Sequence, residues 1–207
     1  MILFSLLVSL YLAVGNAALA TASQPDTLAW LGSHLRGNLT LCAEFVQKKV
    51  MTALSRPLIS KGRLIFLAGQ GVLWRVMEPF PAKVLVKETE MIKSDEDGTA
   101  RRLSYGQSPL FHALTQVFLS MFTGDLSRLE TAFVVTPVQT GEDWRLTLSP
   151  NDPGFAKFIS VIEVGGGRFV EELLISEPSG DKTMIEFINM DVDSCKLGEA
   201  EKATFAF

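Results

Sequence analysis

Short segments in which apolar and polar residues alternate run through this chain from Leu41 onward, and turn residues separate them. A period of two is that of a β-strand, whose successive side chains point to opposite faces of a sheet. The separating stretches are short enough for hairpins, as at Gly69-Gln70-Gly71, where the glycines permit the positive φ of a tight turn. Because parallel neighbours need long crossovers, the pattern predicts an antiparallel sheet. The strands that we expect cover residues 41–46, 58–66, 72–76, 84–86, 133–138, 144–148, 159–164, 169–175, 183–187 and 204–207.

Two segments have helical spacing instead. The first runs from Asp26, which can cap a helix, to Gly37, which can end one. The second opens with Ser108 as the N-cap and Pro109 at the first helical position, and it ends near Gly124. Its apolar residues cover about half of the helix circumference, which is wider than the ~100° stripe of an ordinary surface helix. This second helix is therefore either a buried core helix or a lid whose spare apolar face lines a cavity.

Residues 1–22 have the character of a signal peptide and contain no charged residue. The apolar run over residues 2–14 fits a signal-peptide core and is shorter than the ~20 residues needed to span a bilayer. Small residues allow cleavage after Ala20 or Ala22. The segment lacks the usual basic start, so an uncleaved N-terminal anchor is the alternative. We expect an exported, periplasmic protein in which residues 23–207 form a single domain.

The acidic balance of the chain argues against nucleic acid as a partner. The formal net charge is −4, and all of it belongs to the segment after the predicted leader. The densest basic clusters are the pairs Lys48-Lys49 and Arg101-Arg102. Binding to a phosphate backbone needs many more positive contacts than these pairs supply. The same balance argues against electrostatic docking on anionic lipid.

The chain has two cysteines, Cys42 and Cys195, near opposite ends of the predicted mature protein. An exported protein meets an oxidising compartment, so we expect these cysteines to form a disulfide. Two buried free thiols are the alternative. Neither cysteine belongs to a Cys-x-x-Cys pair, which argues against redox catalysis.

The sequence shows no residue pattern typical of an enzyme active site. His34 and His112 have no neighbours at metal-ligand spacing, and the glycines at 165–167 lie between two predicted strands, where they form a turn instead of a phosphate cradle. Carboxylates on adjacent predicted strands are typical of the solvent face of a sheet; they are Glu171, Glu172, Asp181 and Glu186. We expect no catalysis, no metal site and no cofactor. The bulky apolar content, with 14 Phe and 3 Trp, suits instead a container for an apolar ligand between sheet and helix.

Several motifs taken together resemble the LolA family of outer-membrane lipoprotein carriers. They are Phe45-Val46-Gln47-Lys48, Arg56-Pro57-Leu58, Gly62-Arg63-Leu64-Ile65-Phe66, Gly71-Val72-Leu73-Trp74 and Glu78-Pro79-Phe80. Further matches follow at Gly124-Asp125-Leu126, at 144–150, at Gly180-Asp181-Lys182-Thr183 and at Phe205-Ala206-Phe207. The resemblance departs at Ala68 and Gly69, which stand where better-studied carriers have an Arg-Pro pair that holds the lid closed.

The resemblance implies an α+β fold, namely an incomplete, half-open antiparallel β-barrel with a helical lid over an apolar cavity. It also implies a monomeric carrier of acylated lipoproteins or related lipids. Such a carrier takes its cargo from an inner-membrane release complex and passes it to an outer-membrane acceptor, and no bond changes. The residues that we expect to line the cavity are Phe45, Leu64, Phe66, Val72, Trp74, Leu114, Phe118 and Phe122. Spacing alone is equally compatible with several of them filling an ordinary core.

Two other functions fit the same half-barrel. An envelope sensor or accessory domain could use it to detect lipid or mislocalised lipoprotein, and we expect such a protein to carry a further C-terminal domain. The chain ends soon after its last predicted strand, which favours the carrier. An enzyme acting on lipid would need a nucleophile inside the cavity.

Overall fold

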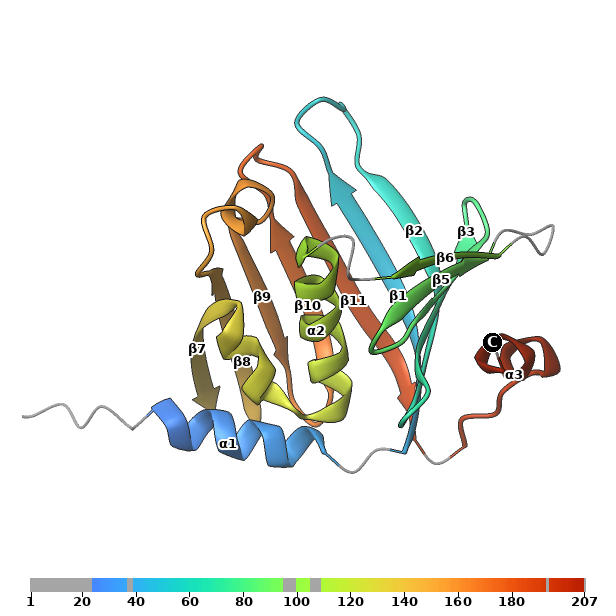
Figure 1. The fold of residues 1–207 in the computed structure, drawn as a ribbon, viewed down its shortest axis with the longest axis horizontal. Coiled ribbons are helices and arrows are strands. Elements are labelled where there is room, and N and C mark those ends of the chain that lie inside the picture. The colour runs from blue at the N-terminus through green and yellow to red at the C-terminus, as the bar shows by residue number, and fades with distance from the viewer. Residues whose placement is uncertain (1–23, 37–38, 95–99, 105–108, 193, 207) are drawn as a thin grey trace, which may run out of the picture.

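A computed structural model describes residues 24–36, 39–94, 100–104, 109–192 and 194–206 (Figure 1). The predicted signal peptide at 1–22, the predicted helix end Gly37 and the predicted N-cap Ser108 lie outside the described residues. Among the residues that are described, none of the helices has both the length and the apolar character needed to cross a bilayer.

The described strands form one eleven-stranded sheet, in which every neighbouring pair is antiparallel. The strand order is β6-β5-β4-β3-β2-β1-β11-β10-β9-β8-β7, so β6 and β7 are the two edges. The sheet is curved and does not close into a barrel, and we call its concave side the hollow (Figure 1). The bounds are β1 Thr40–Val50, β2 Leu58–Leu67, β3 Gly71–Glu78, β4 Ala82–Val86, β5 Glu90–Ser94, β6 Ala100–Ser104, β7 Phe133–Thr140, β8 Asp143–Pro150, β9 Val161–Gly166, β10 Val170–Ser176 and β11 Lys182–Asp191. The predicted half-open antiparallel α+β fold is confirmed.

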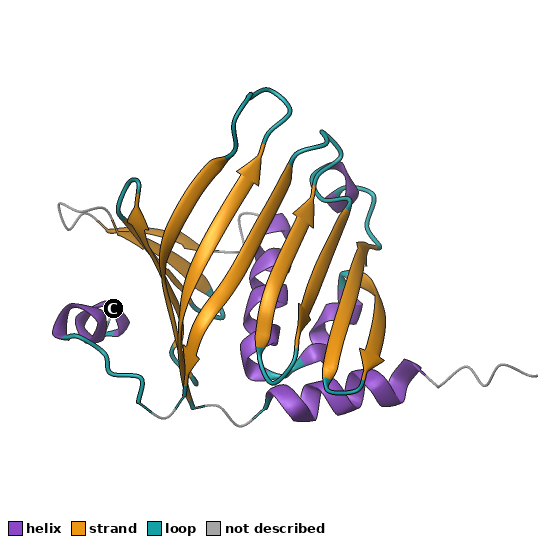
Figure 2. Cartoon of the chain, turned by 180° about the vertical axis from the view of Figure 1, so that it is seen from behind, coloured by secondary structure: helices purple, strands orange, loops and turns teal. Residues whose placement is uncertain are grey.

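The helices occupy different places around the sheet. α2 (Pro109–Thr123) lies in the hollow, and α1 (Gln24–Leu35) crosses one end of the strands and contacts β7 (Figures 1 and 2). Two short 3-10 helices, η2 (Leu126–Thr131) and η3 (Phe155–Lys157), follow α2 and β8. α3 (Glu199–Phe205) lies outside the hollow.

Alternation along the strands divides the apolar residues between two cores. The inward-facing residues of β1, β2 and β3, such as Phe45, Leu64 and Val72, belong to a large core that also contains α1, α2 and η2. The residues between them, such as Ile65 and Leu73, belong to a smaller core on the outer face, which α3 covers with Phe205. Both faces of β2 and β3 are therefore buried, because helices pack on opposite sides of these strands.

Cys42 and Cys195 form the disulfide that the sequence predicts. The bond joins β1 to the segment that leads into α3, across a sequence separation of 153 residues. Beside it, Arg63 donates hydrogen bonds to Cys42 Sγ and to the carboxylate of Glu201, which is only 4% exposed. The C-terminal segment is thus fixed to the outer face of the sheet by a covalent bond and a half-buried ion pair.

The predicted strand at 204–207 is wrong, because Thr204 and Phe205 end α3. Glu201 accepts a hydrogen bond from the N–H of Gly198 at 2.8 Å, which caps the start of this helix. β5 and β6 are strands that the sequence pattern did not predict. All five residues of β6 are exposed, so this strand has no apolar face that alternation could indicate.

Candidate functional site

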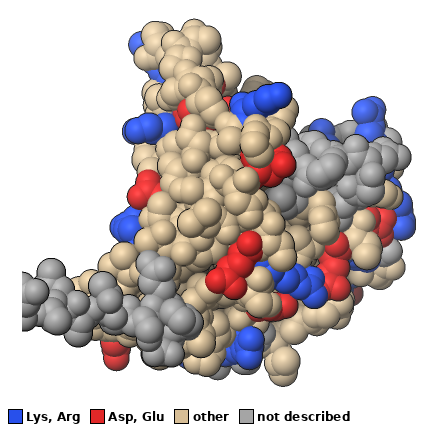
Figure 3. Space-filling model, turned by 60° about the vertical axis from the view of Figure 1, so that its left-hand side comes forward, with Lys and Arg blue, Asp and Glu red and all other residues tan. Residues whose placement is uncertain are grey.

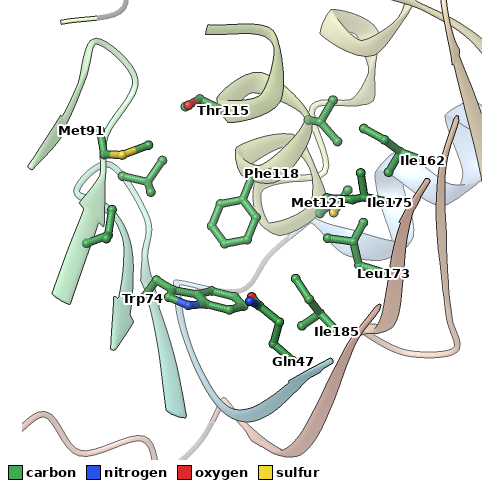
Figure 4. A pocket seen from close by; sticks show the side chains of 13 residues that line it. Gln47, Trp74, Met91, Thr115, Phe118, Met121, Ile162, Leu173, Ile175 and Ile185 are labelled. Carbon is green, nitrogen blue, oxygen red and sulfur yellow. The ribbon is translucent and has the colours of Figure 1, made fainter. Parts of the chain in front are cut away.

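An apolar pocket of about 350 Å³ lies between α2 and the inner face of the sheet (Figure 4). Its size falls at the lower end of the ~300–1,000 Å³ that is usual for small-molecule sites. All but two of the described residues that line it are apolar; the lining consists of Gln47, Trp74, Val84, Val86, Met91, Thr115, Val117, Phe118, Met121, Ile162, Leu173, Ile175 and Ile185. Such a lining suits a flexible hydrocarbon chain, which has no hydrogen-bond donors or acceptors.

Three groups of elements build the pocket. One wall comes from β3, β4 and β5, and it includes Trp74 and Met91. The opposite wall comes from β9, β10 and β11, where Ile162 and Ile175 are register partners on neighbouring strands. α2 covers the space between the walls with residues such as Phe118. The pocket depends on the curvature of the sheet, because these walls belong to strands that are far apart in the strand order.

Aromatic rings hold α2 against the sheet. The indole of Trp74 stacks on the ring of Phe45 with centroids 3.8 Å apart, and it meets Phe118 edge-on at 5.8 Å. The ring of Phe122 stacks on Phe66, also at 5.8 Å. Aromatic pairs of this kind contribute about 0.5–1.5 kcal/mol each beyond the area that they bury. This helix is therefore packed into the core and also lines the pocket.

The residues predicted to line a cavity fall into three groups. Trp74 and Phe118 line the pocket. The others with described side chains are no more than 5% exposed and pack in the surrounding core without lining the pocket; they are Phe45, Leu64, Phe66, Val72 and Phe122. Leu114 lies in α2, and its side chain is outside the described part of the structure.

Sequence reasoning missed the second wall of the pocket. Ile162, Leu173, Ile175 and Ile185 occupy inward positions of three predicted strands. The alternation that places them on the same face as the core is weak in these strands, because the neighbours Val161, Leu174 and Met184 are also apolar. Ala68 and Gly69, at the position of the family's Arg-Pro pair, lie in the exposed turn between β2 and β3. Without that pair, α2 packs on the sheet through the aromatic contacts described above.

A larger groove, of about 1020 Å³, crosses the outer face over β8 to β11. Its lining is mixed and includes five carboxylates, and Arg145 forms an ion pair with Glu172 inside it. Charged side chains of both signs are also spread over the face shown in Figure 3. Because the inner pocket has almost no polar lining and the outer groove is charged, the inner pocket is the candidate site for an apolar ligand.

The two histidines make ordinary structural contacts. His34 lies within hydrogen-bond distance of the carbonyl of Gly167, at 3.1 Å, and stacks on Trp30. His112 lies on the exposed side of α2 beside Gln116. The described residues contain no group of three or more His, Cys, Asp or Glu side chains that could hold a metal ion.

The sequence of this chain matches one known protein family. Residues 20–182 match the family described as "Outer membrane lipoprotein carrier protein LolA-like". The chain belongs to this LolA-like family. No curated protein matches the chain.

Two solved structures of MucB show the same fold at low sequence identity. MucB is 14% identical with a TM-score of 0.51, over 88% of this chain and 63% of MucB. The MucB of the Pseudomonas aeruginosa MucA/MucB complex gives 14% identity and a TM-score of 0.50, over 86% of this chain and 60% of that chain. This LolA-like chain therefore spans about three fifths of the length of MucB. A LolA superfamily protein from Nitrosomonas europaea is 8% identical with a TM-score of 0.44, over 86% of this chain and 97% of that chain.

Proposed function

We propose that this LolA-like protein is a periplasmic carrier that binds the acyl chains of lipoproteins or related lipids in the pocket under α2. The observation that carries the proposal is the lining of that pocket, which is apolar on both sheet walls and on the helix. Each methylene group moved from water into such a site contributes about 0.8 kcal/mol. A chain of ordinary length thus gains enough free energy to be held without any reaction.

The route of the cargo follows from the same proposal. Residues 1–22 serve as the signal peptide, and the Cys42–Cys195 disulfide suits an oxidising compartment. The monomeric carrier receives acylated cargo from an inner-membrane release complex and gives it to an outer-membrane acceptor. Release requires a site that is only moderately complementary to the cargo, and a pocket covered by a helix that packs on the sheet through aromatic contacts meets that requirement.

Native mass spectrometry of protein purified from the periplasm of an expression host tests the proposal. We expect the wild-type protein to carry the additional mass of a lipid or lipopeptide. Phe118→Asp places a charge in the pocket and should abolish the bound mass. Phe158→Asp is the matched control, because Phe158 is 55% exposed and does not line the pocket. Wild-type protein that carries no lipid, also after incubation with lipopeptide, would contradict the proposal.

The second candidate function is an envelope sensor. MucB has this fold and forms a complex with MucA. A sensor would retain a protein partner through purification, whereas a carrier needs to leave its donor and acceptor after each transfer. Cross-linking in the periplasm followed by mass spectrometry separates the two functions: a single stoichiometric partner supports the sensor, and acylated cargo without such a partner supports the carrier.

A further inference from the structure

Two polar side chains interrupt the apolar lining of the pocket. Gln47 lies on β1 between its register partners Ser60 and Ile185, and its amide points into the pocket (Figure 4). Thr115 lies on α2 and is 4% exposed, and its hydroxyl points away from the helix toward the side of Met91 (Figure 4). One polar group therefore comes from the sheet and the other from the helix above it.

Neither polar group has a hydrogen-bond partner among the residues that the structure describes. The described side-chain nitrogen and oxygen atoms that are sealed from solvent all have partners, so the polar atoms of Gln47 and Thr115 remain accessible from the pocket. A polar group in apolar surroundings costs free energy unless it is hydrogen-bonded. Leucine and valine would fill the same space without that cost, so packing does not explain either residue.

We infer that Gln47 and Thr115 bind the ester or amide linkage of an acyl chain, so that the pocket selects fatty acyl esters and amides over plain hydrocarbons. The inference rests on the proposed lipid-carrier function and names the class of ligand for that same pocket. The carbonyl oxygen of the linkage accepts hydrogen bonds from the Gln47 amide or the Thr115 hydroxyl, both of which can donate. A few placed polar groups in an apolar site commonly fix the orientation of a ligand in this way.

The test compares two ligands that differ only in the linkage. Diphenylhexatriene, a neutral hydrocarbon dye, reports on the pocket by its fluorescence. Methyl laurate and an alkane of equal length then compete with the dye. The variants are Gln47→Leu and Thr115→Val, which keep the size of each side chain. The matched controls are Gln139→Leu and Thr136→Val on β7, where both side chains are exposed.

We expect the wild-type protein to bind methyl laurate more tightly than the alkane. At least one of the two pocket variants should bind methyl laurate about 5- to 10-fold more weakly, as expected for one lost hydrogen bond, and both should bind the alkane and the dye as the wild type does. Unchanged preference for methyl laurate in both variants overturns this inference and leaves the carrier proposal standing. A wild-type protein that binds neither the dye nor either ligand overturns both.

Discussion

The phenyl ring of Phe45 lies over Gly62, in the space that a side chain at position 62 would need. A Cβ atom there would lie 2.6 Å from Cζ of the ring and 2.0 Å from the carbonyl oxygen of Arg75. Because Gly62 leaves this space empty, Phe45 can lie flat against Trp74, which forms part of the pocket wall. Gly62 on β2 thus allows the packing of Phe45 that supports Trp74 in the pocket wall.

We predict that Gly62→Ala destabilises the protein strongly. Both the aromatic ring and the β3 backbone would have to move, so we expect a loss of about 3 kcal/mol, at the upper end for overpacking, and a fall in Tm of roughly 6–12 °C. Thermal unfolding followed by circular dichroism measures the change. Gly167→Ala is the control, because a Cβ there meets only ordinary contacts at 3.4 Å or more. Equal melting temperatures for Gly62→Ala and the wild type would contradict the prediction.

Alternation along the chain was enough to predict most of this sheet, but it missed β5 and β6 and wrongly predicted a strand at 204–207. β6 is exposed along its whole length, so hydrogen bonding to β5 holds it without an apolar face. The last residues of the chain have strand-like composition, but the hydrogen bonds of Glu201 to Gly198 and Arg63 favour a helix there. Whether such a short segment forms a helix or a strand depends on contacts with distant segments, and the local spacing of apolar residues carries no information about those contacts.

The spacing of apolar residues also predicts only part of the pocket. Phe45 and Trp74 both face inward, yet only Trp74 reaches the open space, while Phe45 is covered by its neighbours. Alternation determines which face a residue is on. Whether an inward side chain fills the core or lines a pocket depends on sheet curvature and on the position of α2, which no local pattern specifies.

Asp181 joins two hairpin turns and should make stability depend on pH. Its carboxylate accepts hydrogen bonds from the backbone N–H of Thr52 at 2.8 Å and from the Thr52 hydroxyl at 3.0 Å. These bonds, the backbone one first, lower the pKa of Asp181 below its ordinary value of 3.8. A lowered folded-state pKa means that the link stabilises the protein above the ordinary pKa and that this stabilisation is lost as the pH falls through the folded-state value.

We therefore expect Asp181→Ala to melt at a lower temperature than the wild type at pH 7, and the difference to narrow as the pH falls below about 4. Melting curves of both proteins across this range provide the measurement. Asp143→Ala, at the exposed first residue of β8, is the control and should follow the wild type throughout. A difference between Asp181→Ala and the wild type that stays constant down to the lowest pH would rule out the ionised link.

Removal of the disulfide should make α3 more mobile and should leave ligand binding in the pocket unchanged. Phe205 and the Cys42–Cys195 bond lie in the outer core, on the face of the sheet opposite α2. In Cys42→Ala/Cys195→Ala we expect a loss of about 2–4 kcal/mol in the free energy of unfolding and faster hydrogen exchange over 199–205. Binding of diphenylhexatriene should stay within about twofold of the wild type, since a change confined to the outer face breaks no pocket contact. Loss of dye binding with unchanged exchange in α3 would contradict this assignment of the two cores.

A larger side chain on the second wall of the pocket should weaken ligand binding without lowering the stability of the protein. Ile175 on β10 is half-buried and lines the pocket. Ile175→Trp directs a larger apolar group into space that the protein leaves open, so we expect stability within about 1 kcal/mol of the wild type and dye binding at least tenfold weaker. Ile188→Trp on β11 is the matched control, because Ile188 faces outward and is 37% exposed. Unfolding curves and dye titrations of the three proteins give both quantities. If Ile175→Trp remains folded and binds the dye as the wild type does, the ligand site lies elsewhere, and the groove on the outer face becomes the next place to look.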